Sequence, residues 1–150
     1  MKTIFTPDAP EAIGPYSQAK ISGNFVFTSG QIPVNPKTGA IEEPDITGQT
    51  VQVCKNVKAI LEAAGSGMNK VVKTMCFLAD IADFADFNEV YKQYFISSPA
   101  RSCVAVKDIP KGCLIEIEAI AELLFKIIAK SRYFVDLSTR LGYTVFVIII

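Results

Sequence analysis

Three charged side chains in the second half of the sequence could do chemistry, because each stands among apolar residues that favour a buried strand. Arg101 lies in the segment ARSCVAV, where a guanidinium must find an anion or reach solvent. Glu116 and Glu118 alternate with apolar residues in IEIEAIA, so we expect both carboxylates on one strand face, about 7 Å apart. The pattern fits an anion-binding site beside an acid or base, and it also fits ordinary surface charges.

The segment that joins these two strands predicts how the charged groups meet. Residues 107–112 contain a proline and a glycine, which favour a turn. A hairpin closed there would place Arg101 nearly opposite Glu116 or Glu118 on the neighbouring strand, offset by one or two residues at most. The two charges could then share one site or form a plain cross-strand ion pair. Gly30 would let a ligand approach the main chain closely, although a glycine at a strand end is also a simple bend.

The composition excludes several kinds of site. The sequence has no histidine, which excludes Ser-His-Asp and Cys-His pairs and every His-ligated zinc or iron site. The four cysteines form no CxxC pair, and we expect free buried thiols in a reducing compartment. No glycine-rich phosphate motif occurs, and the lack of tryptophan argues against a glycosidase with Glu116 and Glu118 as its paired acids. The sequence therefore predicts no metal and no cofactor.

Length and charge favour a soluble, cytoplasmic globular protein. Of the 150 residues 50% are hydrophobic, and 15 Lys and Arg balance 15 Asp and Glu. Nucleic-acid binding therefore has no electrostatic advantage. The first ten residues lack a signal-peptide core, and no run reaches the ~18 apolar residues of a membrane span. We expect no membrane partner.

Apolar periodicity and turn residues predict an α+β fold. The first helix has an apolar period over 53–64, with Asp45 or Thr47 as its cap and Gly65 at its end. The second helix follows Asp83. Residues 31–45 are predicted to form a loop, and strands are predicted over 16–22, 24–29, 71–78, 100–106 and 114–123. The expected architecture is a mixed sheet with two helices on one face, in the order ββαβαββ.

Two kinds of packing follow from this architecture. Both faces of the strand 71–78 are apolar, so we expect this strand to be covered on each side. Aromatic residues form a stripe on the second helix that is expected to pack in the core: Phe84, Phe87, Tyr91, Tyr94 and Phe95. Two helices cannot cover both faces of the whole sheet, so the other face needs a partner, most economically another copy of the chain.

Six blocks of the sequence, in the right order, resemble the reactive intermediate deaminase family, also called the YjgF-like or L-PSP endoribonuclease family. They are IGPYSQA (13–19), VFTSGQIP (26–33), VCKNVKAILEAAG (53–65), FNEVYKQYF (87–95), PARSCVAV (99–106) and IEIEAIA (115–121). The most similar subgroup is RidA, the 2-iminobutanoate/2-iminopropanoate deaminases. The blocks PARSCV and IEIEAIA are the most diagnostic part.

The resemblance implies a chorismate mutase-like fold and a homotrimer with sites in the clefts between subunits. It implies hydrolysis of small 2-imino acids to 2-oxoacids and ammonia, with a functional link to pyridoxal-phosphate dehydratases that release the parent enamines. Arg101 would hold the substrate carboxylate, and Glu116 would orient or activate a water. The other implied site residues contact the reacting end or line the pocket: Tyr16, Ser29, Gly30, Asn88 and the main chain at Cys103.

Two other functions remain open at this point. The family's other name implies RNA cleavage, but residues 1–125 hold 11 basic and 14 acidic residues and no basic stripe interleaved with aromatics. A non-catalytic sensor could bind 2-oxoacids in the same cleft, and it would use Arg101 as well.

The C-terminal residues differ from the rest of the chain. We expect a deaminase-like domain over 1–124 and an atypical extension of unknown role over 125–150. Residues 126–150 carry four basic residues and one acid, and they end in an uncharged segment of high β propensity. The extension could add a sheet edge, bind a partner, or be a readthrough or frame-shifted end without a role.

Overall fold

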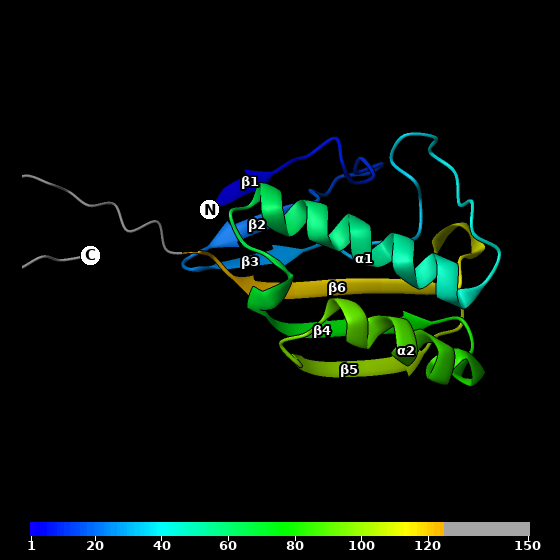
Figure 1. Ribbon diagram of the computed structural model, residues 1–150. Helices are drawn as coiled ribbons and strands as arrows, with labels where there is room; N and C mark the ends of the chain where they lie inside the picture. The colour runs from blue at the N-terminus through cyan, green and yellow to red at the C-terminus, as the bar shows by residue number, and fades with distance from the viewer. Residues whose placement is uncertain (125–150) are drawn as a thin grey trace, which may run out of the picture.

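The computed structural model describes residues 1–124, which form one mixed sheet with two helices on one of its faces (Figure 1). The helices are α1 (Ile46–Ala63) and α2 (Phe84–Tyr94). The strands are β1 (Lys2–Ile4), β2 (Ala19–Ser22), β3 (Phe25–Thr28), β4 (Val71–Leu78), β5 (Ala100–Ala105) and β6 (Ile115–Glu122). The predicted class is confirmed, and β1 adds one strand to the predicted order. The extension predicted over 125–150 lies outside the described residues.

Helix α1 is bounded by the predicted residues, although it begins earlier than its apolar period. The Asp45 side chain accepts a hydrogen bond from the backbone N–H of Gly48 at 2.8 Å, which caps the first turn. Gly65 follows the last turn with a φ of +81°, a left-handed conformation that glycine adopts without strain. The buried residues of the helix, among them Val53, Val57 and Leu61, pack against β3 and β6.

The strand order is β1-β2-β3-β6-β4-β5, and this corrects the predicted hairpin. Strand β5 pairs with β4 in parallel, and β6 lies between β3 and β4 and is antiparallel to both. A helix separates β4 from β5 along the chain, and such a crossover joins parallel strands. On β6 the residues that face the helices are buried, which suits a central strand: Ile115, Ile117, Ala119 and Ala121.

A β-bulge in β4 changes the predicted faces of that strand. The register shifts between Val71 and Lys73, so Val71 is buried on the same side as Cys76 and Leu78. Val72 and Met75 are exposed, so the strand is covered by helices on one face only. The prediction that both faces are covered was therefore wrong for the single chain.

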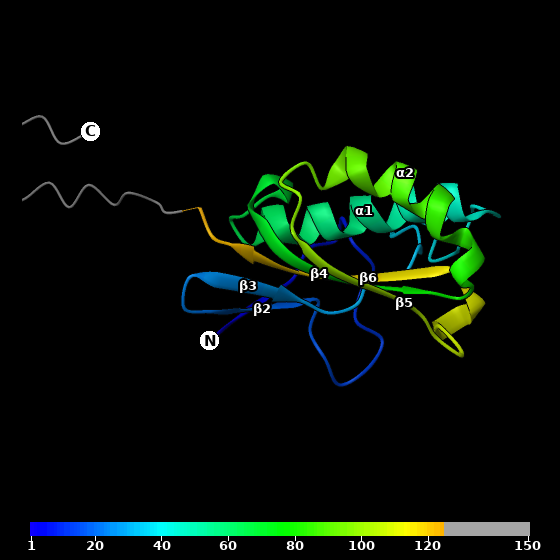
Figure 2. The ribbon, with the colours of Figure 1, turned by 90° about the horizontal axis from the view of Figure 1, so that it is seen from below.

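The face of the sheet opposite the helices, called the open face below, carries several exposed apolar side chains. Figure 2 shows α1 and α2 on one side of the sheet and the connection between β1 and β2 on the other. Phe25, Phe27, Met75 and Val104 on this face are 37–48% exposed. Covering such a surface is favourable in water. None of the helices in residues 1–124 is long and apolar enough to cross a membrane.

Candidate active site

Arg101 lies under α2, on the helix side of the sheet. On β5 it is the partner of Thr74 on β4, which is fully buried, so both side chains face α2. The Arg101 Nη1 donates a hydrogen bond to Asn88 Oδ1 at 2.8 Å. Cys103, two residues further along β5, faces the same side opposite Cys76. We call Arg101, Asn88 and Cys103 the arginine cluster.

Arg101 has no carboxylate partner among residues 1–124. The two ion pairs in this part of the chain are Lys58–Glu62 and Lys92–Glu89, both on helix surfaces. The expected cross-strand pair with Glu116 or Glu118 is therefore not formed. Asn88 accepts a hydrogen bond from one nitrogen of the guanidinium. The remaining N–H groups of Arg101 can bind an anionic ligand, because a planar guanidinium suits bidentate contact with a carboxylate.

Cys103 does not present a reactive thiolate. Burial raises the pKa of its thiol, and the nearby positive charge of Arg101 lowers it by less. Burial also raises the pKa of Cys76 to about 12. All four cysteines are free, and three of them are buried, as expected from their apolar surroundings: Cys54, Cys76 and Cys113. Nucleophilic catalysis by a thiol therefore has no support at this site.

Glu116 lies on the open face, directly against Gly30. A Cβ atom on residue 30 would overlap the Glu116 carboxylate, so glycine is required for this close approach. Burial raises the pKa of the Glu116 carboxyl, and the negative charge of Glu118 on the same strand face raises it further. A raised pKa suits a group that exchanges a proton with water near neutral pH.

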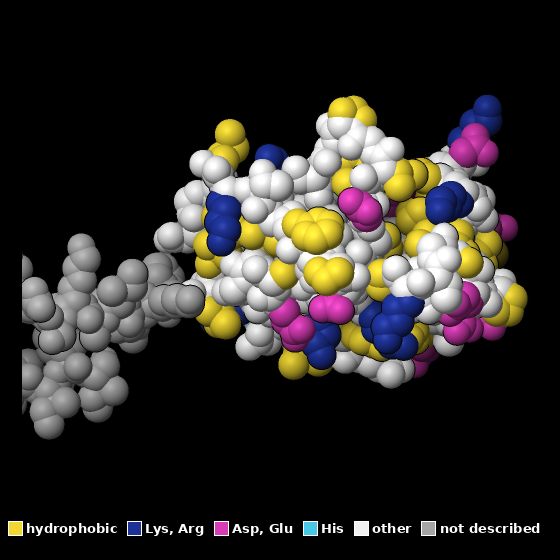
Figure 3. Space-filling view, turned by 90° about the horizontal axis from the view of Figure 1, so that it is seen from above, with side chains coloured by type: hydrophobic (Ala, Val, Ile, Leu, Met, Phe, Trp, Pro, Cys, Tyr) yellow, Lys and Arg dark blue, Asp and Glu magenta, His cyan; other side chains and the backbone are white. Residues whose placement is uncertain are grey.

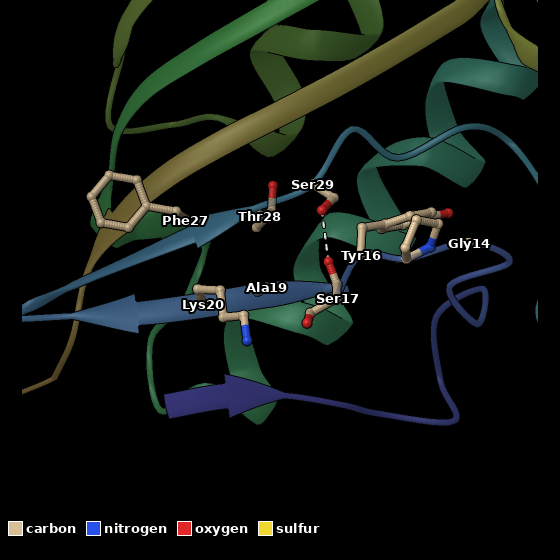
Figure 4. Close-up of a pocket in the computed structure, with 9 residues that line it drawn as sticks. Gly14, Tyr16, Ser17, Ala19, Lys20, Phe27, Thr28 and Ser29 are labelled. Carbon is tan, nitrogen blue, oxygen red and sulfur yellow. Dashed lines mark hydrogen bonds between the residues drawn. The ribbon is translucent and has the colours of Figure 1, made fainter. Parts of the chain in front are cut away.

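The turn that holds Gly30 is fixed to the loop before β2. Ser29 Oγ donates a hydrogen bond to the Ser17 carbonyl at 2.6 Å, and the Ser29 N–H donates to the Gln18 carbonyl at 2.9 Å. Figure 4 shows Ser29 and Ser17 joined in this way, with Tyr16 beside them. We call Tyr16, Ser29, Gly30 and Glu116 the glutamate cluster.

Two hollows adjoin the glutamate cluster. A groove of about 580 Å³ runs between the loop before β2 and strands β2 and β3, and Tyr16 and Ser29 line it (Figure 4). A second pocket of about 230 Å³ is lined by Tyr16, Gly30 and Lys111, among others. Arg101 lines neither hollow, so a small ligand bound in one of them would not reach the guanidinium of the same chain.

The two clusters do not form one site within a single chain. Arg101 is in register with Thr74 and Ala119, whereas Glu116 is in register with Phe77 and Val104. The two residues are therefore about 10 Å apart across the strands and about 10 Å apart along them, on opposite faces of the sheet. The prediction that one hairpin unites them was wrong.

The aromatic residues on α2 contact Arg101 as well as the core, and the sequence interpretation did not predict this contact. Phe87, Tyr91 and Phe95 are buried in the core, as predicted, and Tyr94 is half-buried. The prediction was wrong for Phe84, which lies at the start of the helix and is exposed. The Arg101 guanidinium also lies over three rings of the stripe, with Cζ 4.6 Å from the ring centroid of Tyr91, 5.5 Å from that of Phe84 and 5.6 Å from that of Phe87. The signal in the sequence was the spacing of these rings around Asn88.

Other kinds of site have little support in the described part of the chain. No group of three or more Cys, Asp or Glu side chains in residues 1–124 could hold a metal ion. On the face that Figure 3 shows, Lys and Arg side chains are interspersed with Asp and Glu, and no broad basic surface forms there. That face offers no continuous track for a phosphate backbone.

Comparisons with known proteins agree with the resemblance. The family described as Endoribonuclease L-PSP matches residues 6–123. A RutC family protein of Pyrococcus horikoshii is 58% identical over 121 residues, which cover 80% of this chain and 96% of the relative. The 2-iminobutanoate/2-iminopropanoate deaminase of Salmonella typhimurium is 53% identical over 124 residues, with coverage of 80% and 96%.

A solved structure agrees as well. Escherichia coli TdcF with bound serine has a TM-score of 0.79 and 48% sequence identity, and the match covers 83% of this chain and 100% of that one. The order of the six sequence blocks, the mixed sheet with two helices and these relatives agree with one another. This chain belongs to the Endoribonuclease L-PSP family, the reactive intermediate deaminase family that its sequence blocks resemble.

Proposed function

We propose that this protein is a hydrolytic deaminase that converts 2-iminopropanoate and 2-iminobutanoate to the 2-oxoacids and ammonia. The observation that carries the proposal is the state of Arg101. Its guanidinium is held by Asn88 and by aromatic rings, and it has no carboxylate partner in residues 1–124. An arginine in this state suits the carboxylate of a small organic acid. The name of the Salmonella typhimurium relative supports the same substrate class.

Each active site, in this proposal, is shared by two copies of the chain in a homotrimer. The arginine cluster and the glutamate cluster lie on opposite faces of the sheet, so a second subunit must supply one of them. The exposed apolar residues Phe25, Phe27, Met75 and Val104 give the open face a reason to be covered. Strand β5 is the edge of the sheet and carries Arg101, so it can lie along the boundary between two copies.

The chemistry needs mainly positioning, because imines already hydrolyse slowly in water. Arg101 binds the substrate carboxylate and thereby fixes the imine carbon. Glu116 holds a water beside that carbon and accepts a proton as the water oxygen forms the new C–O bond. The C=N π bond opens as the C–O bond forms, and Glu116 returns the proton to the nitrogen, which gives a carbinolamine. The hydroxyl proton of the carbinolamine then passes through Glu116 to the nitrogen, the C–N bond breaks, and ammonia leaves as the C=O bond of the 2-oxoacid forms. Water is the only co-reactant.

The substrate would come from enzymes that release reactive enamines. Pyridoxal-phosphate dehydratases that act on serine or threonine form enamines, which tautomerise to 2-imino acids. We place the protein in the cytoplasm beside such enzymes, where it would remove these reactive intermediates. The serine bound to Escherichia coli TdcF supports a site of the size of a small amino acid.

The proposal is tested in a coupled assay with threonine dehydratase. The protein is expected to accelerate the release of ammonia and 2-oxobutanoate, and the variant Arg101→Ala is expected to lose this acceleration. Wild-type acceleration in Arg101→Ala would refute the assigned role. Tight binding of 2-oxobutanoate without any turnover by the wild type would instead identify a sensor. Ribonuclease activity that survives extensive purification would favour RNA as the substrate.

We also propose that residues 1–124 form the deaminase domain and that residues 125–150 are an extension of unknown role. The family match ends at residue 123, which supports this division. A chain truncated after residue 124 is expected to keep the oligomeric mass and the deaminase activity of the full chain. Loss of either property on truncation would show that the extension belongs to the assembly.

A further inference from the structure

The aromatic side of α2 contacts the candidate anchor as well as the core. Asn88 and Tyr91 are three positions apart, so they project from the same side of the helix. Asn88 accepts a hydrogen bond from Arg101 Nη1, and Tyr91 places its ring 4.6 Å from Arg101 Cζ. Of the three rings near the guanidinium, Tyr91 is the nearest. A guanidinium over a ring face at this distance is attracted by the π electrons.

Tyr91 is itself fixed from two sides. Its hydroxyl shares a hydrogen bond of 2.7 Å with Thr74 Oγ1, and Thr74 is the cross-strand partner of Arg101. The ring of Phe95 stacks on that of Tyr91 with the centroids 4.3 Å apart and an interplanar angle of 22°. Tyr91 and Thr74 are both buried. The ring therefore has little freedom to turn, and it presents a fixed surface to Arg101.

The contact between Tyr91 and Arg101 is one of ring face to cation and not an ion pair. Burial raises the pKa of Tyr91 to about 12, while the hydrogen bond shared with Thr74 opposes the shift by a smaller amount. The phenol is uncharged at neutral pH. Arg101 consequently keeps its positive charge unneutralised, and that charge remains available for a ligand.

The nearest of the three rings and the hydrogen bond to Asn88 then determine how the guanidinium is presented. The ring of Tyr91 restricts the plane of the group, and Asn88 restricts its rotation within that plane. We infer that Tyr91, locked by Thr74, is a positioning residue that aims the free N–H groups of Arg101 at the substrate carboxylate. The inference rests on the proposed function for the identity of the ligand, whereas the geometry of the ring and the guanidinium is independent of it.

Four variants of the full chain separate positioning from stability. Tyr91→Leu removes the ring and keeps a smaller apolar side chain. Tyr91→Phe keeps the ring and loses the hydroxyl, and Thr74→Val removes the partner of that hydroxyl with little change in shape. Tyr94→Leu is the matched control, because Tyr94 is a half-buried tyrosine on the same helix whose ring is not among those that lie under the Arg101 guanidinium.

The first measurement is steady-state kinetics in the coupled assay, together with calorimetric binding of 2-oxobutanoate. Tyr91→Leu is expected to raise KM and the Kd of 2-oxobutanoate about tenfold, with a much smaller change in kcat. Tyr91→Phe is expected to raise both constants about twofold to threefold, because the ring that faces Arg101 remains but loses its hydrogen bond to Thr74. Thr74→Val is expected to lie between them, and it serves as the test if Tyr91→Leu does not fold.

The second measurement does not depend on turnover. The chain has three arginines, Arg101, Arg132 and Arg140, so the NMR signals of Arg101 can be assigned with the variant Arg101→Lys. Protons of Arg101 that lie over the Tyr91 ring are expected to show a ring-current shift to high field. This shift is expected to disappear in Tyr91→Leu and to persist in Tyr91→Phe and Tyr94→Leu.

The outcomes distinguish the inference from the proposed function. Wild-type KM, Kd and Arg101 shifts in Tyr91→Leu or Thr74→Val, with a lower melting temperature alone, would overturn the positioning role. An equal rise of KM in Tyr94→Leu would also overturn it, because general loosening of α2 would then be the cause. A wild type that binds 2-oxobutanoate without turnover would refute the deaminase, while a tenfold weaker Kd in Tyr91→Leu would still support the positioning of Arg101.

Discussion

The arginine cluster and the glutamate cluster are built in different ways. Arg101 is held by α2, a single helix whose side chains Asn88 and Tyr91 contact it directly. Glu116 lies on the open face against a turn at Gly30. The Ser29 hydroxyl and the Ser29 N–H hold this turn to the loop before β2 by hydrogen bonds to two backbone carbonyls. The first cluster is complete within one chain, whereas the second faces a surface that a partner would cover. The comparison shows why neither cluster alone forms the proposed site.

The largest difference between the clusters should appear when each loses its charged group. Arg101→Ala is expected to lower kcat/KM mainly through KM, because the carboxylate is bound in both the ground and the transition state. Glu116→Gln is expected to lower kcat about 10²-fold to 10⁴-fold with little change in KM, because proton transfer is lost and packing is kept. Steady-state kinetics in the coupled assay measure both.

A matched control for this comparison is Glu118→Gln, which changes the neighbouring carboxylate on the same strand face. It is expected to keep kcat at neutral pH close to the wild-type value. If Glu116→Gln and Glu118→Gln lowered kcat equally, the assignment of the proton-transfer role to Glu116 would be wrong.

Gly30→Ala is expected to have the next largest effect. The new Cβ would overlap the Glu116 carboxylate, which must therefore move away from its position beside the turn. A displaced acid or base is expected to lower kcat about tenfold or more, while binding of 2-oxobutanoate changes little. Gly67→Ala is the control, because its Cβ would approach only the end of the Asn69 side chain. A normal kcat in Gly30→Ala would mean that the position of Glu116 is unimportant.

A smaller effect is expected in the pH profile. Glu116 must be ionised to accept a proton from water, so activity should fall as the pH drops through its raised pKa. The acid limb of kcat should therefore lie above the ordinary carboxyl pKa. Glu118→Gln removes a negative charge that disfavours ionisation of Glu116, and it should shift the limb to lower pH. A limb that does not move, or that moves to higher pH, would contradict the coupling of the two carboxyls.

Local features of the fold could be predicted from the sequence because they depend on near neighbours. Asp45 caps α1, Gly65 ends it, and β4 covers the predicted residues 71–78. Pairing between distant strands could not be predicted in the same way. The turn residues at 107–112 favour a hairpin, but β6 pairs with β3 and β4, where its apolar side fits under α1. The short β1 has one buried residue, Ile4, and no alternating pattern to reveal it.

The candidate site likewise combines features that the sequence could predict with features that depend on the pairing of distant strands. Arg101, Glu116 and the residues around them are candidates that follow from the family resemblance, and in the structure they lie in two clusters. That the clusters occupy opposite faces depends on the parallel pairing of β5 with β4, which is non-local. The contact of Tyr91 with Arg101 depends on the same pairing, because it places Thr74 beside the arginine.

The most direct test of the shared site is to mix two inactive variants. Arg101→Ala and Glu116→Gln are each expected to have little deaminase activity alone at substrate concentrations below the wild-type KM, where activity follows kcat/KM. After unfolding and refolding together in equal amounts, about one quarter of the sites in randomly mixed trimers would combine an intact arginine from one copy with an intact glutamate from its neighbour. The mixture should then regain about one quarter of the wild-type activity. No recovery from a mixture that has assembled normally would contradict the account.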